Sequence, residues 1–275
     1  MALLTGAFVA GILVLALVLV LLEVFSGGPS PATPSPPPQA SASVVAAVAG
    51  APGVALAAAA PGPLDAGQLQ SGQPPLQVAG RPAVVFVGAE FSPYSAAASW
   101  ALVAALGRFG TFRQLGSTLS ASTEVFSHTP GFSFYGTGYT SAEVSFEAVE
   151  GWGDTLSAVA PAGYPTLDRV PEAVSGLLRR YDPPGGAGAT LPFLDVGNRL
   201  VLVGASIGYS PGLLHGMDLA GVAGALGDPT SPVARAVLGT ADEITAVVCS
   251  EDGMRPASVC TDQATSLAAA HLGLG

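Results

Sequence analysis

The stretch that decides the fold is VVFVGAEFSPYSAAASWALVAALGRFGTF, residues 84–112. The short, continuous apolar run from Ala83 to Gly88 predicts a β-strand that is buried on both faces. Ser92 then stands directly before Pro93, and serine is a favourable N-cap while proline suits the first helical position. The sequence therefore predicts a strand that leads into a helix, and this helix ends near Gly107.

Further elements follow toward the C-terminus. Paired short apolar segments around glycine-containing turns predict two β-hairpins, at residues 132–135 with 142–148 and at residues 191–195 with 199–203. Apolar residues at helical spacing predict helices over residues 170–181 and 233–248. This order of elements is an α/β pattern, compatible with a thioredoxin-like layout that carries an inserted segment.

Composition excludes several classes of function. All nine basic residues are arginine, so the chain has no lysine for a P-loop or a Schiff base. The net charge of −10 does not favour binding to a negatively charged phosphate backbone, so nucleic acid is not expected as a partner. The three histidines, His128, His215 and His271, share no ligand spacing with the cysteines. The sequence therefore predicts neither a metal nor a cofactor.

The sequence of the N-terminus predicts a membrane anchor. Residues 2–22 carry no charge and are dominated by Leu, Val and Ala, and at about 1.5 Å per residue they span roughly 30 Å. We expect a transmembrane helix within residues 1–25, a Pro/Ala-rich linker over residues 26–80, and one folded domain over residues 81–275. The lipid bilayer is thus one expected partner, through the N-terminal helix.

The linker contains one apolar segment of its own, at residues 43–60. Pro52-Gly53 interrupts this segment midway, and alanine favours a membrane only weakly. We therefore expect short helices packed on the domain here, rather than a second span.

Three segments carry a resemblance to a known family. They are residues 84–112, TLPFLDVGNRLVLVGAS at residues 190–206, and ITAVVCSEDGMRPASVC at residues 244–260. In this order they are similar to the membrane-tethered thioredoxin-like family catalogued as domain of unknown function 929. The resemblance covers most of the chain from about residue 80 to 262. It implies a thioredoxin-like α/β domain with a mixed sheet and flanking helices, held at the cell membrane on its extracytoplasmic side.

The family typically has a CPYC-type motif where this chain has Ser92, Pro93, Tyr94 and Ser95. In a Cys-x-x-Cys motif, the helix N-terminus lowers the pKa of the first thiol and makes a thiolate available. A serine hydroxyl forms no disulfide, so dithiol exchange at this motif is excluded. Burial at Glu90, two residues before the motif, could raise its pKa, yet we expect a satisfied or solvent-facing carboxylate there.

Binding is the function that such a motif retains. Thioredoxin-like proteins hold an extended segment between the motif helix and the loop before a proline that is usually cis, and Leu191-Pro192 matches that position. We expect a redox-inactive binding protein rather than an enzyme, whose partner is another membrane or envelope protein. Tyr94, Leu191 and Pro192 are the expected contacts, and Phe91 and Trp100 are further aromatic candidates that more often belong to a core.

Two enzymatic alternatives stay open. Cys249 and Cys260 stand eleven residues apart, and we expect a structural disulfide between them, whereas a displaced redox pair would make the protein a thiol-disulfide oxidoreductase. Ser206 lies in a G-x-S-x-G match directly after a predicted strand, with aspartates and His271 following in hydrolase order. Against a serine hydrolase, Pro211 follows too soon for a helix that starts at Ser206.

Overall fold

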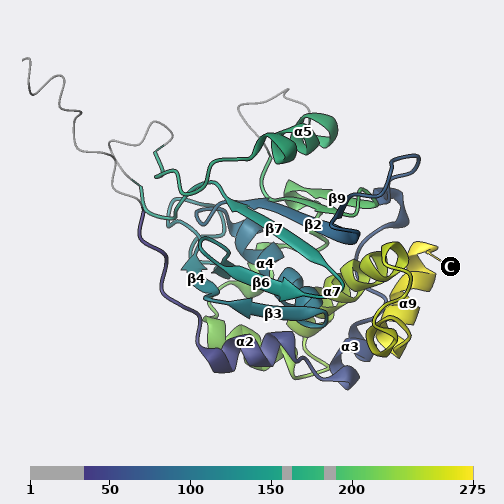
Figure 1. The fold of residues 1–275 in the computed structure, drawn as a ribbon. Coiled ribbons are helices and arrows are strands. Elements are labelled where there is room, and N and C mark those ends of the chain that lie inside the picture. The colour runs from purple at the N-terminus through teal and green to yellow at the C-terminus, as the bar shows by residue number, and fades with distance from the viewer. Residues whose placement is uncertain (1–33, 157–162, 183–189, 275) are drawn as a thin grey trace, which may run out of the picture. The chain divides into compact units, whose positions relative to one another are not determined.

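The computed structural model describes residues 34–156, 163–182 and 190–274. The predicted anchor within residues 1–25 lies outside this part of the chain. The remaining fold begins at Pro36, where a single compact unit starts (Figure 1).

The centre of this unit is a mixed β-sheet. Its strands are β1 (Gln77–Val78), β2 (Arg81–Gly88), β7 (Ser145–Glu150), β8 (Phe193–Val196) and β9 (Leu200–Val203). β2 pairs in parallel with β7 and antiparallel with β8, and β8 pairs antiparallel with β9. The predicted first strand and the second predicted hairpin are therefore confirmed.

The first predicted hairpin, residues 132–135 with 142–148, is wrong. The segment contributes instead to two antiparallel pairs, β3 (Gly110–Arg113) with β6 (Gly138–Ser141) and β4 (Gly116–Leu119) with β5 (Pro130–Ser133). Its second arm becomes β7 and joins β2 in the central sheet. The alternation of apolar and polar residues identified a strand correctly, but alternation does not select the strand's partner.

Three helices flank the sheet: α4 (Pro93–Gly107), α5 (Glu172–Tyr181) and α7 (Pro232–Glu251). α4 begins as predicted, with Ser92 as N-cap and Pro93 in the first turn. The predicted helices at residues 170–181 and 233–248 correspond to α5 and α7. The fold is therefore mixed α/β.

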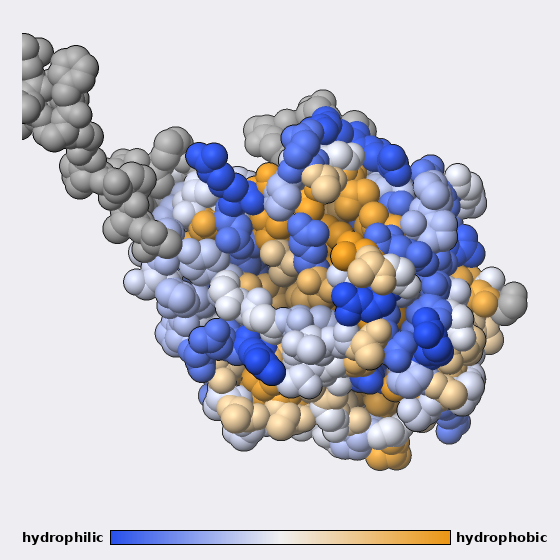
Figure 2. Space-filling view, viewed as in Figure 1, coloured by the Kyte–Doolittle hydropathy of each residue, from blue (hydrophilic) through white to orange (hydrophobic). Residues whose placement is uncertain are grey.

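The side chains of β2 show how the helices divide the sheet. Val84 and Phe86 belong to the main core together with α4 and α7, whereas Val85 and Val87 pack toward α5. This alternation follows from the two-residue period of a strand, and it explains why the sequence of β2 is apolar throughout. α5 packs against this second face of the sheet. Figure 2 shows hydrophobic side chains gathered below α5, over the strands.

The segment before Arg81 is part of the same compact unit. It forms α2 (Ala42–Ala49) and α3 (Gly53–Ala59), separated at Pro52, and their side chains at Val48 and Leu56 join the main core. The prediction of short packed helices is thus confirmed. Within the described residues, no single helix has the length and apolar character to cross a membrane. α2 and α3 meet that test only as a pair, bent by 57°.

Shorter elements complete the unit. They are η1 (Ala66–Gln68), η2 (Gly204–Ile207), η3 (Pro211–Leu214), α6 (Leu219–Leu226), α8 (Ala257–Cys260) and α9 (Gln263–Leu272).

Candidate functional site

The Ser-Pro-Tyr-Ser segment lies at the N-terminus of α4, directly after β2. The backbone N–H of Ser95 donates to Oγ of Ser92 over 3.2 Å, which caps the helix. Oγ of Ser95 accepts from the N–H of Ala89, also over 3.2 Å. Both serine side chains are buried. The two hydroxyls therefore satisfy backbone groups at the strand-to-helix turn.

Leu191 and Pro192 precede β8 and are joined by a cis peptide bond. The carbonyl oxygen of Pro192 accepts from the N–H of Gly204 over 2.7 Å. Within the described part of the chain, neither the N–H nor the carbonyl of Leu191 forms a hydrogen bond. Two backbone groups are therefore available at this position for an external strand.

A cavity of about 410 Å³ brings Leu191 and the motif together. Its lining residues are Phe91, Ser92, Pro93, Tyr94, Glu124, Val125, Phe126 and Leu191. Pro192 is buried behind Leu191 and does not line the cavity. Two of the three expected contact residues thus share one hollow, which we call the motif cavity.

The loop that contributes Glu124, Val125 and Phe126 was not identified from the sequence. This loop connects β4 and β5, and the side chain of Val125 is 90% exposed. The ring of Phe126 meets Tyr94 edge to face at 6.1 Å. The only signal in the sequence was an apolar pair within a polar stretch, and nothing local places that pair beside α4.

The aromatic candidates divide between the core and the cavity. Trp100 is fully buried, and its Nε1 donates to the carbonyl of Pro130 over 2.8 Å, so it is a core residue. Phe91 lines the motif cavity and stacks on Tyr164 with ring centroids 4.3 Å apart.

A second cavity of about 500 Å³ shares Tyr94 with the first. It is lined by Pro63, Asp65, Gln68, Tyr94, Ala205, Ser206, Gly208, Tyr209 and Ser210. Tyr94 therefore stands between two hollows, and we call the pair the Tyr94 groove. A larger cavity of about 700 Å³ lies elsewhere, beside Leu119, His128 and His215, and none of the predicted site residues lines it.

Two buried carboxylates lie at the ends of the parallel strands β2 and β7. Oε1 of Glu90 accepts from the Ser133 hydroxyl over 2.5 Å, and Oε1 of Glu150 accepts from the N–H of Phe134 over 3.2 Å. Burial raises the pKa of Glu90 to about 7 and that of Glu150 to about 8, and mutual repulsion contributes to the rise for Glu150. In both hydrogen bonds the donor belongs to β5 or to the residue after it. These carboxyls therefore connect the strands inserted between α4 and β7 to the central sheet.

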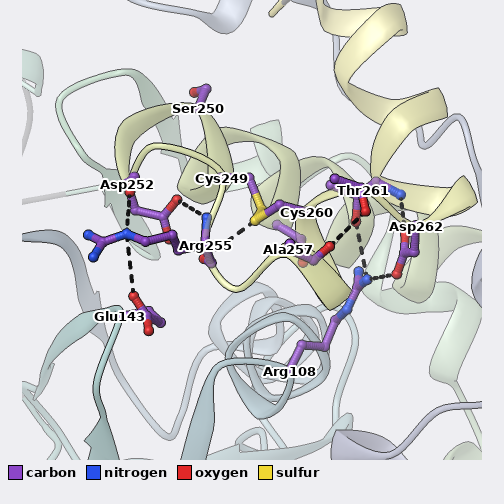
Figure 3. Close-up of a disulfide and its surroundings, with 12 residues drawn as sticks. Arg108, Glu143, Cys249, Ser250, Asp252, Arg255, Ala257, Cys260, Thr261 and Asp262 are labelled. Atoms are coloured by element: carbon purple, nitrogen blue, oxygen red, sulfur yellow. Dashed lines mark hydrogen bonds and ion pairs between the residues drawn. A yellow bond between two sulfur atoms is a disulfide. The ribbon is translucent and has the colours of Figure 1, made fainter.

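Cys249 and Cys260 form a disulfide between the end of α7 and α8 (Figure 3). Each cysteine is only 1% exposed. Between them, the N–H of Arg255 donates to the Asp252 carboxylate over 2.9 Å, and the Arg255 carbonyl lies 3.4 Å from the Cys260 sulfur. The turn that joins the two cysteines is thus held by several contacts besides the bridge.

The residues of the hydrolase alternative have other partners. Oγ of Ser206 accepts from the N–H of Val203 over 2.6 Å, and Nε2 of His271 lies 3.0 Å from the carbonyl oxygen of Leu64. Asp242, one of the aspartates between Ser206 and His271, is paired with Arg108 at 3.1 Å. Among the described residues, no hydrogen bond joins Ser206 to His271. In the same part of the chain, no group of three or more His, Cys, Asp or Glu side chains is arranged to hold a metal ion.

Neither curated proteins nor solved structures gave a match to this chain. A family model does match, and its segment contains β2, the Ser-Pro-Tyr-Ser turn, α4 and the inserted strands. Residues 70–158 match the family described as Domain of unknown function (DUF929), which confirms the family resemblance, and the segments at residues 190–206 and 244–260 lie outside this match.

Proposed function

We propose that this protein is a redox-inactive, thioredoxin-like protein that binds an extended segment of a partner polypeptide at the motif cavity. The observation that carries the proposal is at Leu191. This residue lines the same cavity as Tyr94, and its backbone N–H and carbonyl have no partner among the described residues. An extended segment gains main-chain hydrogen bonds at such a position and needs no sulfur chemistry.

The connectivity of the sheet supports the thioredoxin-like part of the proposal. β2 is followed by α4 and by a parallel strand, β7, and then α5 leads to the antiparallel hairpin of β8 and β9, with α7 after it. The cis proline directly before β8 and the insertion between α4 and β7 fit the same layout.

The burial of the disulfide supports a structural role for it. A thiolate exchanges with a disulfide only by reaching one of its sulfurs, and both cysteines are almost fully buried. We propose that the bridge stabilises the C-terminal turn by roughly 2 to 4 kcal/mol. A reduction potential below about −300 mV is expected for the pair, whereas exchange near about −200 mV would favour the oxidoreductase alternative.

A membrane location belongs to the same proposal. Its support is the uncharged apolar run of residues 2–22, together with a disulfide, which persists in oxidising compartments. The partner is then another membrane or envelope protein. We expect the full-length chain to remain in the membrane fraction after alkaline extraction. We also expect a protease added on the extracytoplasmic side to cleave it.

Photo-crosslinking in cells that produce the full-length chain tests the binding site. A photoreactive residue in place of the exposed Val125 is expected to capture a polypeptide, and the same residue in place of Leu267 on α9 is the control. Adding Tyr94→Ala to the Val125 probe is expected to abolish the capture. An undiminished crosslink in that double variant would show that the motif cavity does not bind the partner.

A further inference from the structure

We infer that the Tyr94 groove selects extended segments in which an apolar side chain lies close to a basic one. This inference rests on the proposed function and adds the chemistry of the partner segment. It depends on the exposed apolar side chains of the motif cavity and on the unpaired carboxylates of the groove.

The motif cavity offers an open apolar wall. Phe91, Val125, Phe126 and Leu191 line it from three separate parts of the chain. Val125 is 90% exposed although it lies beside other apolar side chains. Burying an apolar side chain of the partner against this wall removes apolar surface from water on both molecules.

The charged side chains that line the groove are both acidic. Glu124 lines the motif cavity and Asp65 lines the second cavity. In the described part of the chain, no arginine lines either cavity, and neither carboxylate takes part in an ion pair. Because the whole chain carries a net charge of −10, no distant positive field offsets these two groups. The charge that complements the groove is positive.

Several other polar groups of the second cavity already have hydrogen-bond partners. Nε2 of Gln68 donates to the carbonyl of Ser206 over 2.9 Å, and Oε1 of Gln68 accepts from the N–H of Asp65 over 2.8 Å. The Ser210 hydroxyl accepts from the N–H of Gly212 over 3.2 Å. Asp65 caps η1, and its Oδ1 accepts from the N–H of Gly67 over 2.7 Å, while no cation among the described residues pairs with its carboxylate. The two carboxylates are thus the charged groups of the groove that a basic side chain would meet.

The test is selection from a displayed library of random twelve-residue peptides on the full-length chain, followed by binding measurements on the enriched peptides. The enriched sequences are expected to combine Leu, Ile, Val, Phe or Met with Arg or Lys. Against the double variant Asp65→Asn/Glu124→Gln, affinity for these peptides is expected to fall about two- to fivefold at low salt, with a smaller difference at high salt. Asn preserves the cap at position 65.

The matched control is Asp218→Asn/Glu172→Gln, which changes the net charge equally and lies outside the groove. Unchanged affinity in this control, with loss in the groove variant, is the supporting result. Enriched peptides without basic residues, or equal losses in both variants, would overturn the inference. If Tyr94→Ala still abolished binding in that case, the proposed function would stand. Binding that survives Tyr94→Ala would overturn both.

Discussion

Replacement of Glu150 by glutamine is expected to remove a large pH dependence of stability. Glu150 is 2% exposed, and burial raises the pKa of its carboxyl from 4.5 to about 8. Between these two values the folded state binds the proton and the unfolded state does not, so stability falls as the pH rises. The slope approaches ~1.4 kcal/mol per pH unit, which gives a loss of about 2 kcal/mol between pH 6 and pH 8 from this group.

Glutamine has almost the same shape and retains the oxygen that accepts from the N–H of Phe134. The Glu150→Gln variant is therefore expected to match the wild type below pH 5 and to exceed its stability at pH 8. Urea unfolding of both proteins at a series of pH values measures the difference. Glu147→Gln, on the same strand, removes an equal charge and is the control. A constant difference in the free energy of unfolding across this range would refute the reasoning, because it would show that Glu150 ionises normally in the folded state.

Three further predictions concern the core, the disulfide and the motif. Trp100→Phe leaves a buried carbonyl of β5 without its donor, and a loss of about 1 to 3 kcal/mol in the free energy of unfolding is expected in urea titrations. Cys249→Ser/Cys260→Ser is expected to lower the melting temperature, and reductant is expected to lower the wild-type value but to leave that of the double variant unchanged. Ser92→Cys/Ser95→Cys places two thiols at the start of α4, so a disulfide between them is expected under oxidising conditions, measured by mass spectrometry of alkylated protein, and a pair that stays reduced would contradict the proposed setting of the motif.

Local signals predicted the elements that hold the site. Ser92 and Pro93 fix the start of α4 through capping and backbone geometry, which act within a few residues. Gly197 and Asn198 lie between β8 and β9 with positive φ angles of 67° and 57°, so the turn of the second hairpin was also visible in the sequence. The position of Leu191 beside the motif followed from the family resemblance, and the structure places both in one cavity.

Non-local pairing accounts for what could not be predicted. β7 has the alternation of a hairpin strand, yet it pairs in parallel with β2, which lies about sixty residues earlier. That choice brings Glu150 next to Glu90, so neither the carboxyl pair nor the raised pKa of Glu150 could be expected from the sequence. The contribution of Val125 to the motif cavity has the same origin, because the inserted strands position its loop.

The amide of Leu191 gives the most direct test of the central claim. Its hydrogen exchange and chemical shift are measured by NMR on the labelled full-length chain, with and without a peptide selected from the displayed library. The account predicts that this amide exchanges rapidly in the free protein and becomes protected in the complex, with shifts at Tyr94 and Val125. An unprotected Leu191 amide, with the largest shifts around His128 and His215 at the other cavity, would contradict it.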